Sequence, residues 1–311
     1  MNLKSVKNKI KSIDKTRQVT KAMEAVSAVK MRKSQALAIG TRPYALAALK
    51  ILRAVSGSID ALRHPLLFVR PVRKTLIIVV TSDKGLAGVY TSALFRGFYR
   101  MLRLGGYTKE TIALYCIGRK GFEHFSKRGY TIVGHEERWG DKVSFDKIRP
   151  LADLSKNLFV GGEYDAVLIV YTNFISTLRQ EVVTRQLLPL SFSSVEEAIR
   201  GITPKTGRYA DLSADVDAQT TPTPEYTFEP GAEKILSELI PALFNVEIYH
   251  AVLEANASEH SSRMIAMKNA SDNARDISKA LKLKFNKVRQ AAITREVSEI
   301  VGGMESMKIS E

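Results

Sequence analysis

Residues 242–301 read ALFNVEIYHAVLEANASEHSSRMIAMKNASDNARDISKALKLKFNKVRQAAITREVSEIV, and these 60 residues contain neither glycine nor proline. An α-helix rises about 1.5 Å per residue, so an uninterrupted helix of this length spans roughly 90 Å. A domain of about 200 residues has a radius of gyration of only about 16–17 Å. We therefore expect much of this helix to project from its own domain and to end at Gly302-Gly303.

The second half of the run has the residue spacing of a coiled coil. Small and apolar positions recur at alternating steps of three and four residues, which places them on one stripe of a helix that needs a partner. Several of them are small, so the partner helix is expected to lie close. The stripe consists of Met264, Met267, Ser271, Ala274, Ser278, Leu281, Phe285, Val288 and Ala292, and basic residues from Arg263 to Arg295 are expected to coat the other faces.

Residues 1–39 also lack glycine and proline and predict a second long helix. Its apolar pattern begins with the same spacing, is interrupted at Arg17 and resumes later, which indicates a change of phase. A bend is expected at residues 40–43, before a further helix over residues 44–56. Because both ends of the chain are long helices without a partner, we expect them to form an antiparallel two-helix coiled coil. The pattern uses Leu3, Val6, Ile10 and Ile13 before the interruption and Met23 and Val26 after it.

The positive charge of the chain is concentrated at its two ends. The 311 residues carry a formal net charge of +15. Residues 1–53 contribute +11, residues 260–311 contribute +4, and the segment between them is neutral. Such basic helices suit a nucleic acid, an anionic membrane or an acidic protein sleeve. No apolar run reaches the roughly 18 residues of a membrane span and no secretory signal is evident, so we expect a soluble, intracellular protein.

The middle of the chain changes from helical to strand periodicity. Short, continuously apolar stretches alternate with helical ones, as in a sheet buried on both faces. This alternation predicts a Rossmann-like, mostly parallel α/β domain. The expected strands cover residues 75–81, 111–117, 131–133, 166–171 and 180–190, and the expected helices cover residues 89–104, 119–127, 151–160 and 194–199.

The complete chain is expected to divide into four segments. Residues 1–57 form the N-terminal coiled-coil helix and residues 73–200 the α/β domain. Residues 201–231, rich in Thr, Pro, Asp and Ala, form a polar connecting segment, and no function is assigned to residues 201–225. Residues 232–304 form the C-terminal coiled-coil helix.

One loop stands where α/β proteins often bind phosphate. Residues 81–88, TSDKGLAG, follow a predicted strand and precede a predicted helix. The stretch lacks the G-x-G-x-x-G pattern of dinucleotide-binding folds and the Gly-Lys-Ser/Thr ending of a P-loop. We therefore favour a tight turn with a helix cap over a phosphate site.

Residues that could support catalysis or bind a metal ion are scattered. Cys116 has no cysteine partner, which excludes an intramolecular disulfide and suits a reducing compartment. The histidines have no ligand spacing, and His250 and His260 on the long helix are expected at ordinary surface or seam positions. The sequence predicts no catalytic residue, no metal site and no cofactor. The five histidines are His64, His124, His135, His250 and His260.

Two other classes of function remain as alternatives. A basic coiled-coil scaffold that binds nucleic acid would explain the charge, but the terminal helices have few aromatic residues for base stacking and contain no recognised binding module. An enzyme built on the central sheet would require nucleotide binding or turnover by the isolated chain, and we expect neither.

Four stretches resemble the gamma subunit family of F-type ATP synthases, in the order in which that family has them. They are residues 10–35 (IKSIDKTRQVTKAMEAVSAVKMRKSQ), residues 82–88 (SDKGLAG), residues 263–274 (RMIAMKNASDNA) and residues 286–303 (NKVRQAAITREVSEIVGG). The chain departs from the family pattern at Met304, where Gly-Ala is frequent after the last glycine, and at Ala87, where cysteine is frequent.

The resemblance implies a rotor subunit without catalytic residues of its own. In this family the terminal helices form a central shaft inside a ring of three alpha and three beta subunits. The α/β domain, with the epsilon subunit, contacts the c-ring of the membrane sector. Ion flow turns the ring and the shaft, which drives the beta subunits through different affinities. The expected location is the cytoplasmic face of the bacterial inner membrane, as a peripheral protein without a membrane span or a nucleic-acid partner.

The resemblance also implies contact residues. Met23 matches a methionine near acidic loops of the beta subunit, and other positions near the C-terminus match residues that bond with beta-subunit loops. Basic residues of the first helix are candidates for general attraction to that acidic lining. Tyr226 and Glu229 resemble the segment that contacts c-ring loops. The C-terminal positions are Arg289, Gln290, Thr294 and Glu296, and the basic candidates are Lys21, Lys30, Arg32 and Lys33.

Overall fold

The computed structural model describes residues 3–55, 64–139, 143–191 and 231–308. The chain divides into two compact units. The helix-pair unit comprises residues 1–26 and 264–311, and the sheet unit comprises residues 27–263. The long helices α1 (Leu3–Gly40) and α8 (Ala232–Lys308) contribute residues to both units. The predicted helix 194–199 lies outside the described residues.

The sheet unit contains a five-stranded sheet in the order β3-β2-β1-β4-β5. β1 pairs in parallel with β2 and β4, β2 pairs in parallel with β3, and β5 pairs antiparallel with β4. All residues of β1 and β2 are buried, as expected of strands covered on both faces. The Rossmann-like, mostly parallel domain is therefore confirmed. The strands are β1 (Thr75–Val80), β2 (Ile112–Ile117), β3 (Ile132–Glu136), β4 (Ala166–Phe174) and β5 (Gln180–Leu188).

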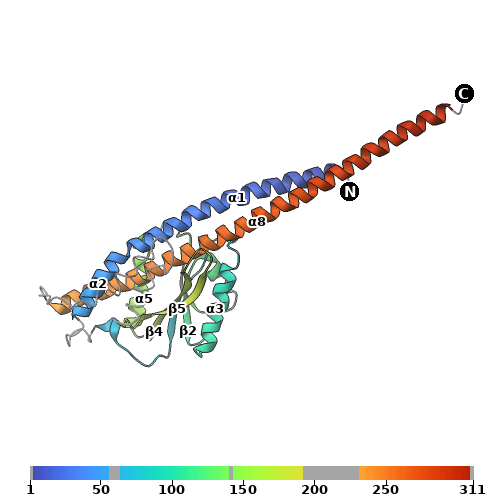
Figure 1. The fold of residues 1–311 in the computed structure, drawn as a ribbon. Coiled ribbons are helices and arrows are strands. Elements are labelled where there is room, and N and C mark those ends of the chain that lie inside the picture. Colours follow the sequence, from blue (N-terminus) through green and yellow to red (C-terminus); the bar gives the residue numbers. More distant parts are fainter. Residues whose placement is uncertain (1–2, 56–63, 140–142, 192–230, 309–311) are drawn as a thin grey trace. The chain divides into compact units, whose positions relative to one another are not determined.

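Helices cover both faces of this sheet. α3 (Tyr90–Leu104) and α4 (Arg119–Ser126) pack on one face, where Phe98 and Phe125 enter a core with Ile77 and Leu114. α5 (Arg149–Val160) and residues 236–255 of α8 pack on the other face, and α3 and α5 lie on opposite sides in Figure 1. α2 (Arg42–Val55) and the short 3-10 helices η2 (Pro65–Leu67) and η3 (Phe145–Lys147) complete the described elements.

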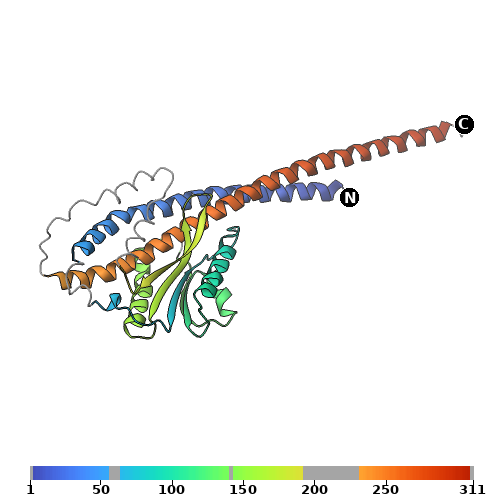
Figure 2. The ribbon, with the colours of Figure 1, turned by 60° about the horizontal axis from the view of Figure 1, so that its bottom comes forward.

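The helix-pair unit contains two antiparallel helices. Residues 3–26 of α1 and the C-terminal part of α8 run side by side in opposite directions in Figures 1 and 2. Met267, Ser271, Ala274 and Ser278 are buried, and the other stripe positions as far as Ala292 are half-buried while most of their neighbours are exposed. The predicted coiled-coil stripe of α8 is therefore confirmed.

The predicted change of phase in α1 is wrong. Val26 is 52% exposed, whereas its neighbour Ser27 is buried. Buried or half-buried positions instead continue the three-four spacing along α1 from Ile13 through polar residues such as Thr20 and Glu24 to Ser34 and Ala38. Only Arg17 on this stripe is exposed. The apparent break arose because polar and small residues occupy the stripe, and hydrophobicity does not mark them.

Helix α8 is longer than the run without glycine and proline. It contains Pro241, the tenth residue of the helix. It also continues through Gly302-Gly303 to Lys308, so the predicted end at these glycines is wrong. A glycine in a helix costs only about 1 kcal/mol relative to alanine. Proline costs more, but Ile240, Leu243 and Phe244 beside it are buried in the core of the sheet unit, and this burial offsets the cost.

In the described part of the chain, one helix could cross a membrane by length and composition alone. The stretch Glu233–Gly302 of α8 contains an 18-residue window with a mean hydropathy of 1.2, although no apolar run long enough for a membrane span was expected. Of that window, 56% is buried inside the structure. This burial is typical of a core helix that packs on a sheet.

Candidate functional site

The first candidate site is the surface of the helix pair. Its two helices meet through small and polar residues: the Ser278 hydroxyl donates to Asp14 Oδ1 at 2.8 Å, and Lys282 Nζ lies 3.8 Å from Asp14 Oδ2. Ser278 is 4% exposed, so this bond lies at the contact between the helices. Small side chains let the two backbones approach closely, which leaves the long basic side chains on the outside. The described pair thus presents a basic surface.

The C-terminal end of α8 presents an apolar stripe to solvent. Ile293, Val297, Ile300 and Met304 recur at steps of three and four residues, which places them on one face of the helix. All four are at least half exposed. In Figures 1 and 2 this part of α8 continues past the N-terminus of α1 within the helix-pair unit. An apolar helix face that its own unit leaves uncovered is typical of a protein-binding surface.

The predicted contact residues on α8 are all exposed. Arg289, Gln290 and Glu296 point to solvent, and the Thr294 hydroxyl donates to the Gln290 carbonyl within the helix at 2.9 Å. In α1, Met23 is half-buried, and exposed Lys21 forms an ion pair with Glu24 at 3.2 Å. These side chains can therefore contact a partner.

The structure does not bring the predicted residues together into one site. The contact of Asp14 with Ser278 sets the register of the pair and places Met23 opposite residues near Asn269, about 20 residues or roughly 30 Å along α8 from Arg289. Lys30, Arg32 and Lys33 belong to the sheet unit, where Arg32 and Lys33 are exposed and Lys30 is half-buried. Tyr226 and Glu229 lie outside the described residues.

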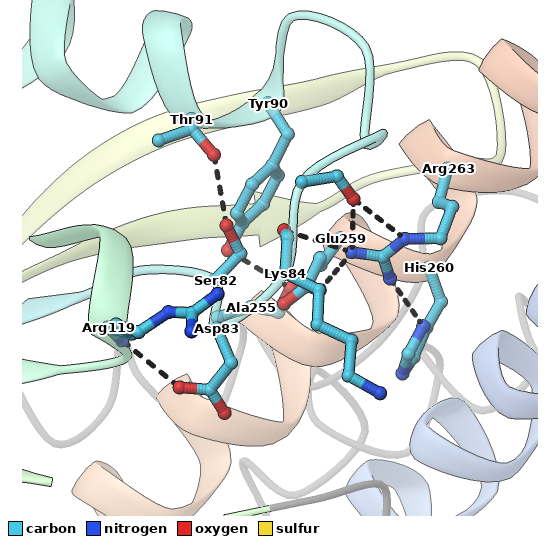
Figure 3. Close-up of polar contacts among 11 residues, drawn as sticks. Ser82, Asp83, Lys84, Tyr90, Thr91, Arg119, Ala255, Glu259, His260 and Arg263 are labelled. Atoms are coloured by element: carbon cyan, nitrogen blue, oxygen red, sulfur yellow. Dashed lines mark hydrogen bonds and ion pairs between the residues drawn. The ribbon is translucent and has the colours of Figure 1, made fainter. Parts of the chain in front are cut away.

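The second candidate site is the loop of residues 81–88, which is bound to α8. The Arg263 guanidinium donates to the carbonyls of Lys84 and Gly85 at 3.3–3.4 Å (Figure 3). The same group pairs with Glu259 Oε1 at 2.5 Å and lies 3.2 Å from His260 Nδ1. Arg263 is only 7% exposed. The loop therefore presents carbonyl oxygens to a buried cation, whereas a phosphate site presents N–H donors.

Asp83 of this loop and Tyr90 just after it also form hydrogen bonds within the sheet unit. Asp83 accepts bonds from the backbone N–H groups of Arg119 and Arg138 at 3.0 and 2.9 Å. The Tyr90 hydroxyl donates to the carbonyl of Ala255 in α8 at 3.3 Å. Tyr90 N–H donates to the Ala87 carbonyl, which closes the predicted tight turn, but no side chain caps α3 at Val89. The loop attaches the sheet to α8.

Several ionisable residues on α8 are buried although the sequence pattern does not predict it. Arg263 was expected on the solvated coat of the helix, and His250 and His260 at surface or seam positions, yet all three are buried in the sheet unit. The spacing of Glu259 and Arg263, four residues apart, indicates a helical ion pair. This spacing alone does not distinguish a buried pair from an exposed one.

The described residues offer little for chemistry. They contain no group of three or more His, Cys, Asp or Glu side chains that could hold a metal ion. Cys116 is buried in β2, and burial raises the pKa of its thiol to about 12, so this residue is a poor nucleophile. The arrangement of the described part is suited to binding and to mechanical attachment.

Comparisons with known proteins agree with this arrangement. A family model described as ATP synthase matches residues 2–307. An ATP synthase gamma chain from Chlorobaculum tepidum is 36% identical over 310 residues, which cover 98% of this chain and 99% of the relative.

Solved structures share the fold at lower identity. A chain from the central stalk and c-ring structure of the Tetrahymena thermophila mitochondrial ATP synthase is 23% identical, with a TM-score of 0.56 over 81% of this chain and 99% of that chain. A chain from the Euglena gracilis mitochondrial ATP synthase, in a structure of OSCP, F1 and c-ring, is 17% identical, with a TM-score of 0.61 over 98% of this chain and 94% of that chain.

These comparisons give no support to a nucleic-acid-binding scaffold. The family model extends over nearly the whole sequence, and the bacterial relative is matched from end to end. The chain belongs to the ATP synthase gamma-chain family.

Proposed function

We propose that this chain is the central shaft of a proton-translocating F-type ATP synthase, in which it couples rotation of the c-ring to the conformational cycle of the catalytic beta subunits. The observation that carries the proposal is the uncovered end of α8, where an exposed apolar stripe ends a basic helix pair. A sleeve of partner subunits would cover that stripe. The membership of the family supports the same role.

In this proposal the chain has no catalytic residue of its own. Nucleotide chemistry belongs to the alpha and beta subunits, and the chain transfers free energy by contacting otherwise similar sites differently. The partners are the alpha and beta subunits, the epsilon subunit and the c-ring. The complex would hold the chain at the cytoplasmic face of the bacterial inner membrane as a peripheral protein.

The four segments expected from the sequence would divide this work. Residues 1–57 and 232–304 supply the shaft, and residues 73–200 supply the domain that contacts the c-ring together with the epsilon subunit. Residues 201–231 connect that domain to the C-terminal helix. The buried bonds of Arg263 to the loop of residues 81–88 would let the sheet turn with α8, since they join the sheet unit to that helix.

The proposed beta-subunit contacts form two levels along the helix pair. Lys21 and Met23 would lie at one level, and Arg289, Gln290, Thr294 and Glu296 at the other. Lys30, Arg32 and Lys33 would add general attraction to acidic loops, which salt screens. Tyr226 and Glu229 are proposed c-ring contacts.

Cysteine cross-linking in the assembled complex tests the function. The only native cysteine, Cys116, is buried, so Met23→Cys or Arg289→Cys adds a single reactive thiol. We expect oxidation to link either variant to a beta subunit that carries a cysteine in the facing loop, to stop multisite ATP hydrolysis, and to release both effects on reduction.

The matched control is Arg103→Cys, because Arg103 is exposed on α3 of the sheet unit. This variant should leave hydrolysis unchanged and form no link to beta. A complex that continues multisite turnover with a fully cross-linked shaft would contradict the rotor mechanism.

A further inference from the structure

A row of ionisable residues lies between α8 and the sheet. Glu247, His250 and Glu254 are spaced by three and four residues, so they share one face of α8. His250 is 2% exposed and Glu254 is 5% exposed. Ionisable side chains are rarely this buried unless they are paired.

Contacts with β4 and β5 surround this row. The Tyr171 hydroxyl of β4 donates to Glu254 Oε2 at 2.7 Å, and His250 Nδ1 lies 3.8 Å from the same oxygen. The Arg185 guanidinium of β5 lies over the Tyr171 ring, 5.4 Å from its centroid. From α5, Lys156 reaches Asn245 of α8 at 3.5 Å and pairs with Asp153 of its own helix at 2.9 Å.

The row is incompletely hydrogen-bonded. Glu247 Oε1 and His250 Nε2 are buried atoms without a hydrogen-bond partner in the described part of the chain. Glu247 is half-buried as a residue, but this oxygen is covered. An ion without hydrogen bonds is costly in such a place, so the neutral forms are favoured.

Burial acts on the three groups in opposite directions. It raises the pKa of Glu254 to about 7 and that of Glu247 to about 8, and in both cases Arg185 opposes part of the shift. Burial and the charge of Arg185 lower the pKa of His250 to about 3. Near pH 6 the row is therefore a set of protonated carboxyl groups beside a neutral imidazole.

We propose that the contact between α8 and strands β4 and β5 is proton-linked: Glu247 and Glu254 hold protons while α8 is packed on the sheet, and their ionisation in mild alkali weakens that packing. The proton is the ligand of this site. Tyr171 and Arg185 are the groups of the sheet that face it, and His250 is its neighbour on α8.

The direction of the effect follows from proton binding. The folded carboxyl groups keep protons that the unfolded chain loses near their ordinary pKa of 4.5, so their contribution to stability is lost as the pH rises toward 7–8. His250 has the opposite effect on stability. Below about pH 6.5 the unfolded chain binds a proton at this histidine, whereas the folded imidazole stays neutral, so stability falls as the pH decreases.

Urea unfolding of the full chain tests the proposal. Trp139 is buried in the sheet unit and reports its unfolding by fluorescence. Between pH 5.5 and 8.5 we expect the unfolding equilibrium constant of the wild type to rise at least about tenfold, since one pKa unit corresponds to a factor of ten. In the double variant Glu247→Gln/Glu254→Gln this rise should disappear.

Glu238→Gln is the matched control, because Glu238 lies on the same helix and is exposed. This variant should keep the pH dependence of the wild type. The proposal is overturned if the double variant keeps that dependence, or if the wild type shows none.

Infrared spectroscopy gives a second test that does not depend on unfolding. At pH 6 the folded wild type should show the carbonyl stretch of protonated carboxylic acids, and this band should fade as the pH rises to 8.5. Glu254→Gln should remove part of the band. A folded wild type without the band at pH 6 would overturn the proposal even if the variants failed to fold.

Discussion

The sheet unit and the helix-pair unit bury different kinds of residue. The largest fully buried side chains, including Phe98, Tyr171 and Phe244, all lie in the sheet unit. The buried positions of the helix pair are mostly small or polar, such as Thr20, Ser271 and Ser278. Since burial stabilises by about 25 cal/mol per Å² of apolar surface, the helix pair gains less per residue. The small residues let the two helices lie close together, but they bury little apolar surface and so stabilise the pair less.

Charged groups show the same difference. In the sheet unit the pair of Arg263 and Glu259 is buried and also holds two loop carbonyls. In the helix-pair unit the pair of Arg275 and Asp272 is about half exposed, at 3.2 Å. Burial makes the first pair costly to break, whereas solvent screens the second. The first half of α8 is thus anchored in the sheet unit by buried contacts, whereas the ion pair in its second half stays exposed to solvent.

Removing a large core side chain should give the largest effect. Phe244→Ala leaves a cavity between α8 and the sheet, and we expect a loss of about 3–5 kcal/mol in the free energy of unfolding. Urea unfolding of the full chain measures it. Phe68→Ala, at an exposed position, should stay within about 0.5 kcal/mol of the wild type. Equal losses for both variants would contradict the assignment of this core.

Breaking the buried ion pair should rank next. Arg263→Ala removes the ion pair with Glu259 and the donor to the carbonyls of Lys84 and Gly85, with an expected loss of about 3 kcal/mol. Arg263→Lys should recover only part of it, because an ammonium cannot reproduce the planar set of donors. Arg275→Ala is the control and should cost under about 1 kcal/mol. The ranking fails if Arg275→Ala costs as much as Arg263→Ala.

Enlarging the contact of the helix pair should have a smaller effect. Ser278→Leu removes the bond to Asp14 and forces the helices apart, and we expect the free energy of local opening to fall by about 1–3 kcal/mol. Hydrogen exchange of amides in residues 8–20 measures this opening. Lys279→Leu at the exposed neighbouring position should leave exchange unchanged. Unaltered exchange in Ser278→Leu would disprove the close contact.

Replacing His250 should have the smallest effect, a change in how stability depends on pH below 7. The pKa of His250 lies near 3 in the fold, against 6.5 in the unfolded chain, so its contribution is present above pH 6.5 and is lost as the pH falls toward 3. In His250→Gln this loss is absent. The stability of the wild type relative to the variant should thus fall by about 1 kcal/mol between pH 7 and 5.5. A constant difference across this range would show that His250 takes up its proton as readily in the fold as in the unfolded chain.

Much of the fold follows from local patterns. Continuous apolar runs predicted the strands β1, β2 and β4 to within a few residues, because strands buried on both faces need such runs. The three-four spacing of α8 predicted its buried stripe for the same kind of reason. The pattern failed in α1, where Thr20 and Ser27 are buried although they are polar. A closely packed helix contact requires small side chains, and a hydrophobicity pattern does not identify residues by size.

Local sequence patterns predicted less of the candidate sites. Exposed contact residues such as Arg289 and Glu296 came from a family resemblance, and no local rule marks them. The bonds of Arg263 to the loop of residues 81–88 join groups nearly 180 positions apart in the chain. The row of Glu247, His250 and Glu254 was also unforeseen, because a helical pattern does not state which face meets a sheet.

The amino-acid order settles which segments are helix and strand, where the charge lies and which family the chain belongs to, since these depend on propensity, periodicity and motif. Whether a given arginine, histidine or glutamate is solvated or enclosed depends on which surfaces meet after folding. Burial sets the cost of a charge and the number of its hydrogen bonds, and it is a property of contacts between distant parts of the chain. Arg263 and Glu254 acquire their roles from those contacts.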